Sequence, residues 1–155
     1  MTIAIAASIT GGAQTGFTTP GYTMTADTPP DVNSKQSAVT ALTGTQAGVV
    51  VHSVSAPFTI TVSRPKVMQQ LGKPNPVTGL ISSVPRNVYK ILTRKGVQPL
   101  IDQPYATAII RTEIEVPAGS DSYDIANLRA ALSAHIGELW AQSAGIGDTT
   151  NNGIL

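Results

Sequence analysis

The sequence predicts an α+β fold, in which an antiparallel β-sheet fills most of the chain and α-helices follow at the C-terminus. Residues 1–117 are rich in Thr, Val, Ile, Ser, Gly and Pro, and their short alternating runs are typical of strands joined by turns. Residues 121–146 are rich in Ala and Leu at helical spacing. Because no helix alternates with the strands, we do not expect a parallel sheet. The length of 155 residues suits a single domain, 1–155.

The N-terminal segment 1–26 is expected to form a β-hairpin. Its strands are predicted at Thr2–Ser8 and Phe17–Ala26, with a turn at Gly11-Gly12. Pro20 removes a backbone donor, so the second strand is expected to be an edge strand or a bulged strand.

The main part of the sheet is expected within residues 48–117, for a total of about five strands. The predicted strands there are Gly48–Val54, Phe58–Arg64, Asn87–Lys95 and Tyr105–Val116. Alternation along Phe58–Arg64 and Tyr105–Val116 indicates one buried face and one wet face. Residues 66–86 hold three prolines and are predicted to be a long loop, whereas residues 27–46 give only a weak strand signal.

The C-terminal region 121–146 is predicted to form two helices and to leave a short tail, 147–155. Asp121 is the expected N-cap, Gly137 is expected to kink or split the helix, and Gly145 and Gly147 are expected to end it. One apolar stripe is predicted along it, formed by Ile125, Leu128, Leu132, Ile136 and Leu139.

The helix stripe is too small to cover the predicted sheet. A fully buried side chain of this kind contributes roughly 1.5–3 kcal/mol, and five of them do not cover five or six strands. We therefore expect a second chain to complete the core, so that the protein is an obligate homodimer.

Enzymatic and metal-binding signals are weak. There is no Cys, so cysteine-based metal sites and disulfides are excluded. His52 and His135 are far apart and have no carboxylate at metal-ligand spacing, and the sequence has no GxSxG, HExxH or P-loop motif. Glu113 and Glu115 fall on one strand face, which we interpret as solvated. We predict no catalytic residues, no metal site and no cofactor.

Membrane and export signals are also weak. No run approaches the roughly 18 apolar residues of a membrane span, so no membrane partner is expected. The start MTIAIAASITGG has no basic region and is not interpreted as a signal peptide. Charged residues are only 12% of the chain, against about 25% in ordinary domains. A surface this poor in charge favours contact with other subunits.

The charges are unevenly distributed. No acidic residue lies between Asp31 and Asp102, whereas eight basic residues do. Together with the hydroxyls of the wet face, they predict an RNA-binding surface, in which cations neutralise phosphates and a tyrosine stacks on an unpaired base. A polar sheet exterior with scattered cations is the other interpretation of the same pattern. The candidate RNA-binding residues are Thr59, Thr61, Ser63, Lys90, Arg94, Tyr105, Thr107 and Arg111.

Several strings, in this order, resemble the coat proteins of levivirus-type single-stranded RNA bacteriophages. Phe58-Thr-Ile-Thr-Val-Ser-Arg-Pro65 resembles the central strand of that family, and Asn87-Val-Tyr-Lys90 resembles the next strand. Asp102-Gln-Pro-Tyr-Ala-Thr107 resembles the start of the last strand, and Ser120–Leu155 resembles the helical end. The resemblance covers roughly residues 48–155.

The resemblance implies a specific structure and function. The family fold has an N-terminal hairpin, an antiparallel sheet and two C-terminal helices, and two subunits join their sheets into an intertwined dimer. Such dimers form an icosahedral (T=3) capsid around the single-stranded genomic RNA. The inner sheet face binds an RNA stem-loop, which represses replicase translation and marks the genome for packaging. The protein is then expected in the virion, after assembly in the cytoplasm of the host bacterium.

The resemblance also implies roles for individual residues. Thr59, Thr61 and Ser63 match the strand residues of the family's adenine pocket, and Lys90 matches the basic contact beside it. Tyr105 matches the stacking tyrosine. Two positions depart from the family pattern, because Leu92 stands where a polar or basic residue is usual, and Thr107 stands where Asn or Asp reads a base.

Other functions remain open at this point. A different self-assembling β-rich subunit, of a pilus or a phage tail tube, has a similar Thr-, Ala- and Gly-rich composition. A stand-alone dimeric RNA-binding regulator has the same basic face without forming particles. A small enzyme or ligand-binding domain stays small in solution and carries no nucleic acid.

Overall fold

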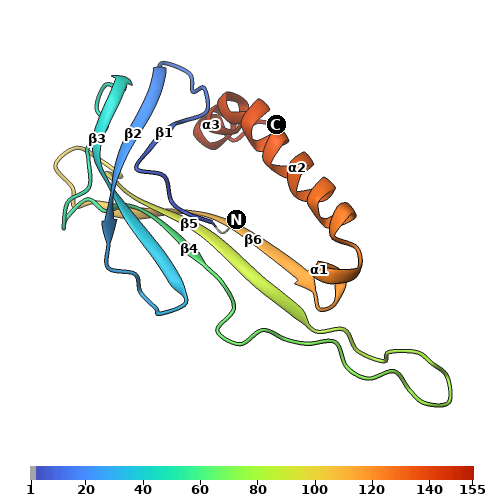
Figure 1. The fold of residues 1–155 in the computed structure, drawn as a ribbon. Helices are drawn as coiled ribbons and strands as arrows, with labels where there is room; N and C mark the ends of the chain where they lie inside the picture. The colour runs from blue at the N-terminus through green and yellow to red at the C-terminus, as the bar shows by residue number, and fades with distance from the viewer. Residues whose placement is uncertain (1–2) are drawn as a thin grey trace.

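One six-stranded antiparallel sheet forms the body of the molecule, and three helical segments follow it (Figure 1). The computed structural model describes residues 3–155. The strands lie in the sheet in chain order, so every connection is a hairpin or a loop between neighbours. Their bounds are β1 Ser8–Thr10, β2 Thr18–Asp27, β3 Ser34–Thr45, β4 Phe58–Ser63, β5 Arg86–Val97 and β6 Ala106–Pro117. The predicted α+β class is confirmed, with six strands instead of about five.

The N-terminal hairpin is present, but its first strand is short and begins late. β1 covers only Ser8–Thr10 and pairs with β2, so most of the predicted strand Thr2–Ser8 is not a strand, and Thr2 itself lies outside the described residues. The backbone N–H of Gly11 donates to the Pro20 carbonyl at 2.7 Å and closes the hairpin. The register of β2 shifts between Thr18 and Gly21. This confirms the bulge that the proline predicted.

Residues 27–46, where the strand signal in the sequence is weak, contain β3, one of the longest strands. β3 pairs with β2 on one side and β4 on the other. The predicted strand Gly48–Val54 is wrong, because the backbone hydrogen bonds of this segment do not form a regular ladder with a neighbouring strand. The His52 N–H donates to the Val39 carbonyl and that of Ser53 to the Ala56 carbonyl, so the chain loops across the end of the sheet.

The last three strands match the prediction. β4, β5 and β6 lie within two residues of the predicted bounds and pair in continuous register, from Phe58 opposite Lys95 to Val97 opposite Ala106. The long loop predicted at 66–86 is also present, between β4 and β5. It extends beyond the end of the sheet (Figure 1).

The helical region is divided differently from the prediction. The segments are α1 Ser120–Tyr123, α2 Ile125–Ala141 and α3 Ser143–Asn152. Asp124 is the N-cap of the long helix instead of Asp121, and α2 continues through Gly137. Hence Gly137 does not split the helix; the break comes at Gln142.

The predicted helix end at Gly145 and Gly147 is wrong, because α3 runs through both glycines into the expected tail. A Cβ on Gly147 would collide with the Gln14 side chain, and one on Gly12 would collide with Ser143. The glycines therefore let α3 lie close to the loop between β1 and β2. Gln14 Nε2 donates to the Ser143 carbonyl at 2.8 Å across this contact.

The helices do not cover the sheet of their own chain. α2 lies wholly within the described residues, and none of its side chains is buried. α1 contacts β6 and α3 is bonded to the β1–β2 loop, so α2 is held at its ends and set apart from the strands (Figure 1). No helix in residues 3–155 is long and apolar enough to cross a membrane.

The core of the single chain is small. Its buried apolar residues within the described part are Met24, Ala38, Val39, Ala56, Val116 and Ala118. The chain exposes 10887 Å², whereas a folded monomer of its mass exposes about 7,400 Å². The excess of about 3,500 Å² shows that the single chain leaves far more surface uncovered than a folded monomer of this size does.

Candidate nucleic-acid interface

One face of the β4–β5–β6 sheet gathers seven of the eight predicted RNA-binding residues. Thr59 lies opposite Arg94, Ser63 lies opposite Lys90, and Thr61 lies opposite Leu92. On the next strand Arg111 lies opposite Leu92 and Thr107 lies opposite Gly96. Because facing residues of paired strands point to the same side, these side chains share one face, called here the polar face. Tyr105 precedes β6 and is half-buried in the 98–105 loop.

Two of the threonines on the polar face are not exposed to solvent. Thr59 and Thr61 are only 2% and 4% exposed, although the strand pattern predicted an exposed face. The Arg94 guanidinium donates to Thr59 Oγ1 at 3.3 Å and to Gln36 Oε1 at 2.8 Å. Thr61 donates to the same Gln36 oxygen at 2.8 Å. Arg94 and Gln36 therefore lie over the two hydroxyls and satisfy them.

The buried polar network continues to the end of β2. Gln36 Nε2 donates to Asp27 Oδ2 at 2.6 Å and to the Thr28 carbonyl. The hydrogen bond from Gln36, with a second from the Thr28 N–H, holds the pKa of Asp27 below its usual value. Arg94 is thus held by hydrogen bonds within the protein, and only the exposed edge of its guanidinium can contact a ligand.

An open pocket lies beside this network on the polar face. It has a volume of about 310 Å³. Leu92 contributes apolar surface, Lys90 and Arg111 contribute cations, and Thr61 and Ser63 contribute hydroxyls. The other lining residues come from the β2–β3 turn and the start of β3; they are Pro30, Asp31, Asn33 and Ser34. The pocket therefore combines an apolar wall, hydroxyls and two cations, which together suit a nucleotide.

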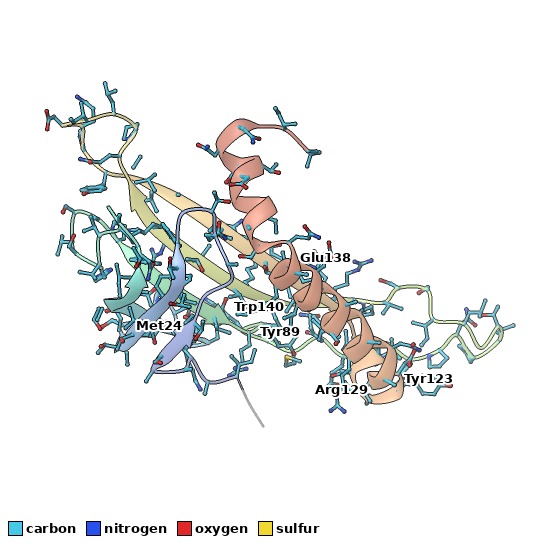
Figure 2. The ribbon with its side chains drawn as sticks, turned by 90° about the horizontal axis from the view of Figure 1, so that it is seen from above. Met24, Tyr89, Tyr123, Arg129, Glu138 and Trp140 are labelled. Carbon is cyan, nitrogen blue, oxygen red and sulfur yellow. The ribbon has the colours of Figure 1, made fainter. Side chains whose placement is uncertain are left out.

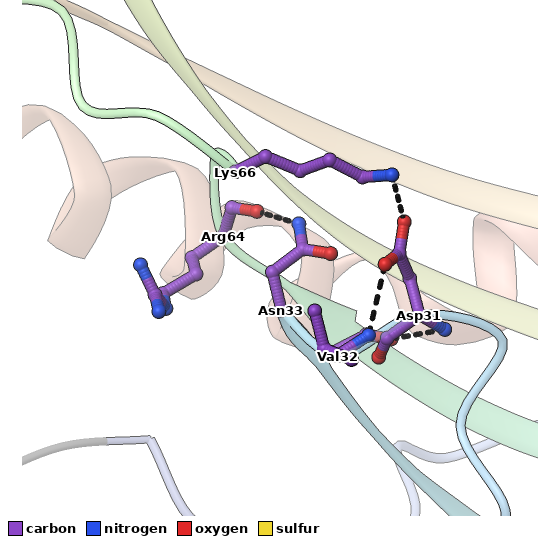
Figure 3. A network of polar contacts seen from close by, with 6 residues as sticks. Asp31, Val32, Asn33, Arg64 and Lys66 are labelled. Carbon is purple, nitrogen blue, oxygen red and sulfur yellow. Dashed lines mark hydrogen bonds and ion pairs between the residues drawn. The ribbon is translucent and has the colours of Figure 1, made fainter.

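The turn beside the pocket is fixed by polar contacts (Figure 3). Lys66 forms an ion pair with Asp31 at 2.5 Å, and this bond lowers the pKa of Asp31. Asn33 donates to the Arg64 carbonyl. The Oδ1 atom of Asn33 is buried and accepts no hydrogen bond from the described residues. This leaves one unpaired acceptor in a residue that lines the pocket.

The cations of the polar face are partly neutralised. Glu113 accepts from Lys90 at 3.1 Å and lies 3.8 Å from Arg111, and Arg86 pairs with Glu115 at 3.0 Å. Exposed ion pairs of this kind contribute about 0–1 kcal/mol, so a phosphate competes with Glu113 at little cost. The face is less cationic than the sequence count suggests.

The basic central segment is also divided between the two faces. Lys95 lies opposite Phe58 on the other side of the sheet, where its Nζ is 4.8 Å from the ring centroid and donates to the Val50 carbonyl. Burial lowers the pKa of Lys95. This lysine is a structural residue and does not belong to the polar face.

The predicted residues form two groups along the polar face. Thr61, Ser63, Lys90 and Arg111 line the pocket. Thr107 is four residues from Arg111 on β6, a distance of about 13 Å at the usual strand rise. Tyr105 lies beyond it. The face therefore has room for two separate contacts along one nucleic-acid strand.

Sequence reasoning missed the residues that come from the β2–β3 region. Gln36 lies over the threonines, and Asn33 and Ser34 line the pocket. The available signal was the run of β-branched and small polar residues in Ser34–Thr45, which is ordinary strand composition. Their neighbours in space are set by the β3–β4 register, which puts Ser34 opposite Ser63.

The second predicted set, the helix stripe, is exposed in the single chain. Ile136 is 61% exposed, Ile125 and Leu139 are also exposed, and Leu128 and Leu132 are half-buried. Trp140 adds to the exposed apolar surface of the same helix. Figure 2 shows Arg129, Glu138 and Trp140 along α2 as it runs above the sheet.

Comparisons with known proteins find a solved structure that is similar to this chain over its whole length. The chain is similar to a solved chain described as the virus-like particle of bacteriophage ESE020, with 55% sequence identity and a TM-score of 0.96, covering 99% of this chain and 100% of the other. It also aligns with the virus-like particle of Beihai levi-like virus 32, with 16% identity, a TM-score of 0.46 and coverage of 86% and 88%. No protein-family model and no curated protein matches the sequence.

Proposed function

Because the chain belongs to the coat proteins of levivirus-type single-stranded RNA bacteriophages, we propose that it forms the shell as an obligate dimer and binds single-stranded RNA on the polar face. The family membership makes it a structural capsid protein that self-assembles and is located in the virion. The dimer, the icosahedral shell geometry and the RNA contacts are our proposal. The observation that carries it is the exposed apolar surface of α2 together with the unpaired edge of β6.

The dimer joins the sheets through β6. This strand is 12 residues long and lies at the edge of the sheet. Ile109 and Ile110 on it are 57% and 68% exposed. A long, exposed, apolar edge is a template for pairing with another chain. In the proposed dimer the two β6 strands pair, and the α2 stripe of each subunit packs over the partner's strands.

The apolar face of the sheet supplies the surface that the stripe covers. Ile60, Val62 and Ile91 share this face and are half-buried in the single chain. Burial of such side chains stabilises by roughly 1.5–3 kcal/mol each. The α2 stripe and the apolar face of the sheet are therefore both partly exposed in one chain, and a second copy of the protein buries both.

The pocket on the polar face holds one unpaired base of the RNA. Its volume of about 310 Å³ is near the lower end of the range for small-ligand sites. Leu92 packs against the base, and Lys90 and Arg111 bind the flanking phosphates. Tyr105 stacks on a second base further along the strand.

To these contacts we assign the biological role that the family resemblance implies. The RNA within the shell is the single-stranded genome, and its stem-loop binds a dimer on the polar face. Binding there marks the genome for packaging and represses translation of the replicase. Assembly takes place in the cytoplasm of the host bacterium.

Expression of the protein in bacteria tests the proposal. We expect closed shells of one main size in electron micrographs, with host RNA inside and a correspondingly high ratio of absorbance at 260 nm to that at 280 nm. Open tubes would support a tail-tube or pilus subunit instead. Dimers that bind RNA without forming particles would support a stand-alone regulator, and a stable monomer would contradict the proposed dimer.

A further inference from the structure

The loop between β4 and β5, residues 64–85, is called here the arm. It leaves the sheet at Ser63 and returns at Arg86, and it extends past the ends of β5 and β6 and past α1 (Figure 1). Every residue from Lys66 to Leu80 is exposed. The arm is thus a large part of the surface that the single chain leaves uncovered.

The base of the arm is fixed to the domain. The side chain of Asn87, only 2% exposed, accepts from the Gln69 N–H at 2.8 Å and donates to the Gln69 carbonyl at 3.1 Å. Tyr89 donates to Met68 Sδ at 3.7 Å. Leu71 contacts Gly119, where a Cβ would lie 3.1 Å from its Cδ2. These contacts set the direction in which the arm leaves the sheet.

The tip of the arm is ordered by its own backbone. The N–H of Asn75 donates to the Leu80 carbonyl, and that of Gly79 donates to the Asn75 carbonyl, both at 2.8 Å. The Asn75 side chain accepts from the N–H of Val77 at 2.8 Å. Four prolines restrict the rest, at positions 65, 74, 76 and 85. A pre-ordered segment loses little conformational entropy when it binds.

The arm presents apolar side chains that nothing in the described chain covers. Val77 and Leu80 at the tip are 91% and 71% exposed, and Val67 near the base is 72% exposed. The segment has no acidic residue and carries Lys73 at the tip. The helical end of the chain, 120–152, has four acidic residues and one arginine. Apolar surface and opposite charge therefore make the arm suited to a second copy of this protein.

The direction of the arm favours a copy other than the dimer partner. In the proposed dimer the sheet grows through β6, at right angles to the strands. The arm instead runs along the strand direction, beyond the end of the sheet (Figure 1). Joining two β6 edges consequently leaves both arms projecting from the dimer.

We infer that the arm is a shell contact, which docks its tip on a neighbouring dimer and links dimers to one another. The inference rests on the proposed dimer as the unit of assembly. In this arrangement Val77 and Leu80 are buried between dimers, and Lys73 faces the acidic helical surface of the neighbour.

The test compares the wild-type protein with the double variant Val77→Ser and Leu80→Ser, using Gln70→Ser as an arm control that removes no apolar side chain. Light scattering after size-exclusion chromatography measures the molar mass and so detects the dimer. Electron microscopy over a series of protein concentrations measures assembly. The double variant is expected to stay dimeric and to need on the order of tenfold more protein to form particles. Asn75→Ala, which loosens the tip, should shift assembly in the same direction by less.

Three outcomes would overturn the inference. The first is that the double variant assembles at the same protein concentration as the wild type. The second is that the double variant no longer forms dimers, which would place the arm in the dimer interface. The third is that Lys73→Ala particles contain no RNA while the double variant assembles normally, which would make the arm an RNA contact. Failure of the proposed function is distinct, because the wild-type protein itself would then form no dimers or no shells.

Discussion

Truncation of Ile136 to alanine tests whether a second chain buries the α2 stripe. In the single chain 61% of Ile136 is exposed, so the alanine variant of a monomer would lose less than about 0.5 kcal/mol. If the partner's sheet buries the rest, the loss is about 1–2 kcal/mol per copy, before any cavity forms. A dimer carries the change twice and loses about 2–4 kcal/mol, which raises its dissociation constant by about 30- to 700-fold.

The assay is urea unfolding of disassembled dimers at several protein concentrations, together with sedimentation equilibrium. Ile136→Ala should lower the urea concentration at the unfolding midpoint. It should also make this midpoint depend more strongly on protein concentration, because the weakened dimer dissociates at protein concentrations that can be measured. Val54→Ala is the matched control, because Val54 is fully exposed in the 46–57 loop and lies outside the helix. Equal, small effects of the two substitutions would refute the reasoning that a partner covers α2.

Four further predictions concern the polar face and its supporting network. Tyr105→Ala should weaken hairpin binding by about 5- to 150-fold if the ring stacks on a base, with particles unchanged in micrographs; equal affinity at every salt concentration would rule the stacking out. Lys90→Ala should reduce the slope of log K against log salt by about 0.7–0.9, whereas an unchanged slope would mean that Lys90 contacts no phosphate. Arg94→Ala should lower the free energy of unfolding by about 1–3 kcal/mol, because Gln36 and Thr59 lose a donor; denaturation of the variant measures this, and no loss would show that the network is dispensable. The pKa values of Asp27 and Asp31 are lowered from 3.8, so the stabilisation that their ionised forms give is present above this value and is lost as the pH falls through the lower, folded-state values. The double variant Asp27→Asn and Asp31→Asn should therefore flatten the acid side of the stability profile, and a profile like that of the wild type would contradict this.

The sequence was most informative where one strand face is apolar and the other is polar. Phe58–Ser63 and Ala106–Pro117 alternate clearly, and the structure forms strands at both places, although Thr59 and Thr61 on the predicted wet face are buried. Gly48–Val54 is equally rich in β-branched residues, yet its backbone bonds go to Val39 and Ala56 instead of to a ladder. Strand composition measures how well side chains suit a sheet, and it cannot show whether a partner strand is within reach.

The helix prediction failed at the glycines for a similar reason. Gly137 is unfavourable in an isolated helix by about 1 kcal/mol, but α2 continues through it. Gly145 and Gly147 look like stop signals, and instead they let α3 approach Gln14 and the β1–β2 loop. Local propensity is outweighed here by a contact between residues more than 120 positions apart.

The sequence alone determined the class of fold and the shared face of the candidate RNA-binding residues, and it predicted that a second chain completes the core. These follow from side-chain periodicity and from the balance of apolar surface, which are properties of the chain itself. Only the tertiary structure decided that Gln36 and Arg94 cover Thr59 and Thr61, that the β2–β3 turn forms the pocket wall, and that the arm projects from the sheet. Those features depend on strand register and loop direction, which bring together residues that no local pattern connects.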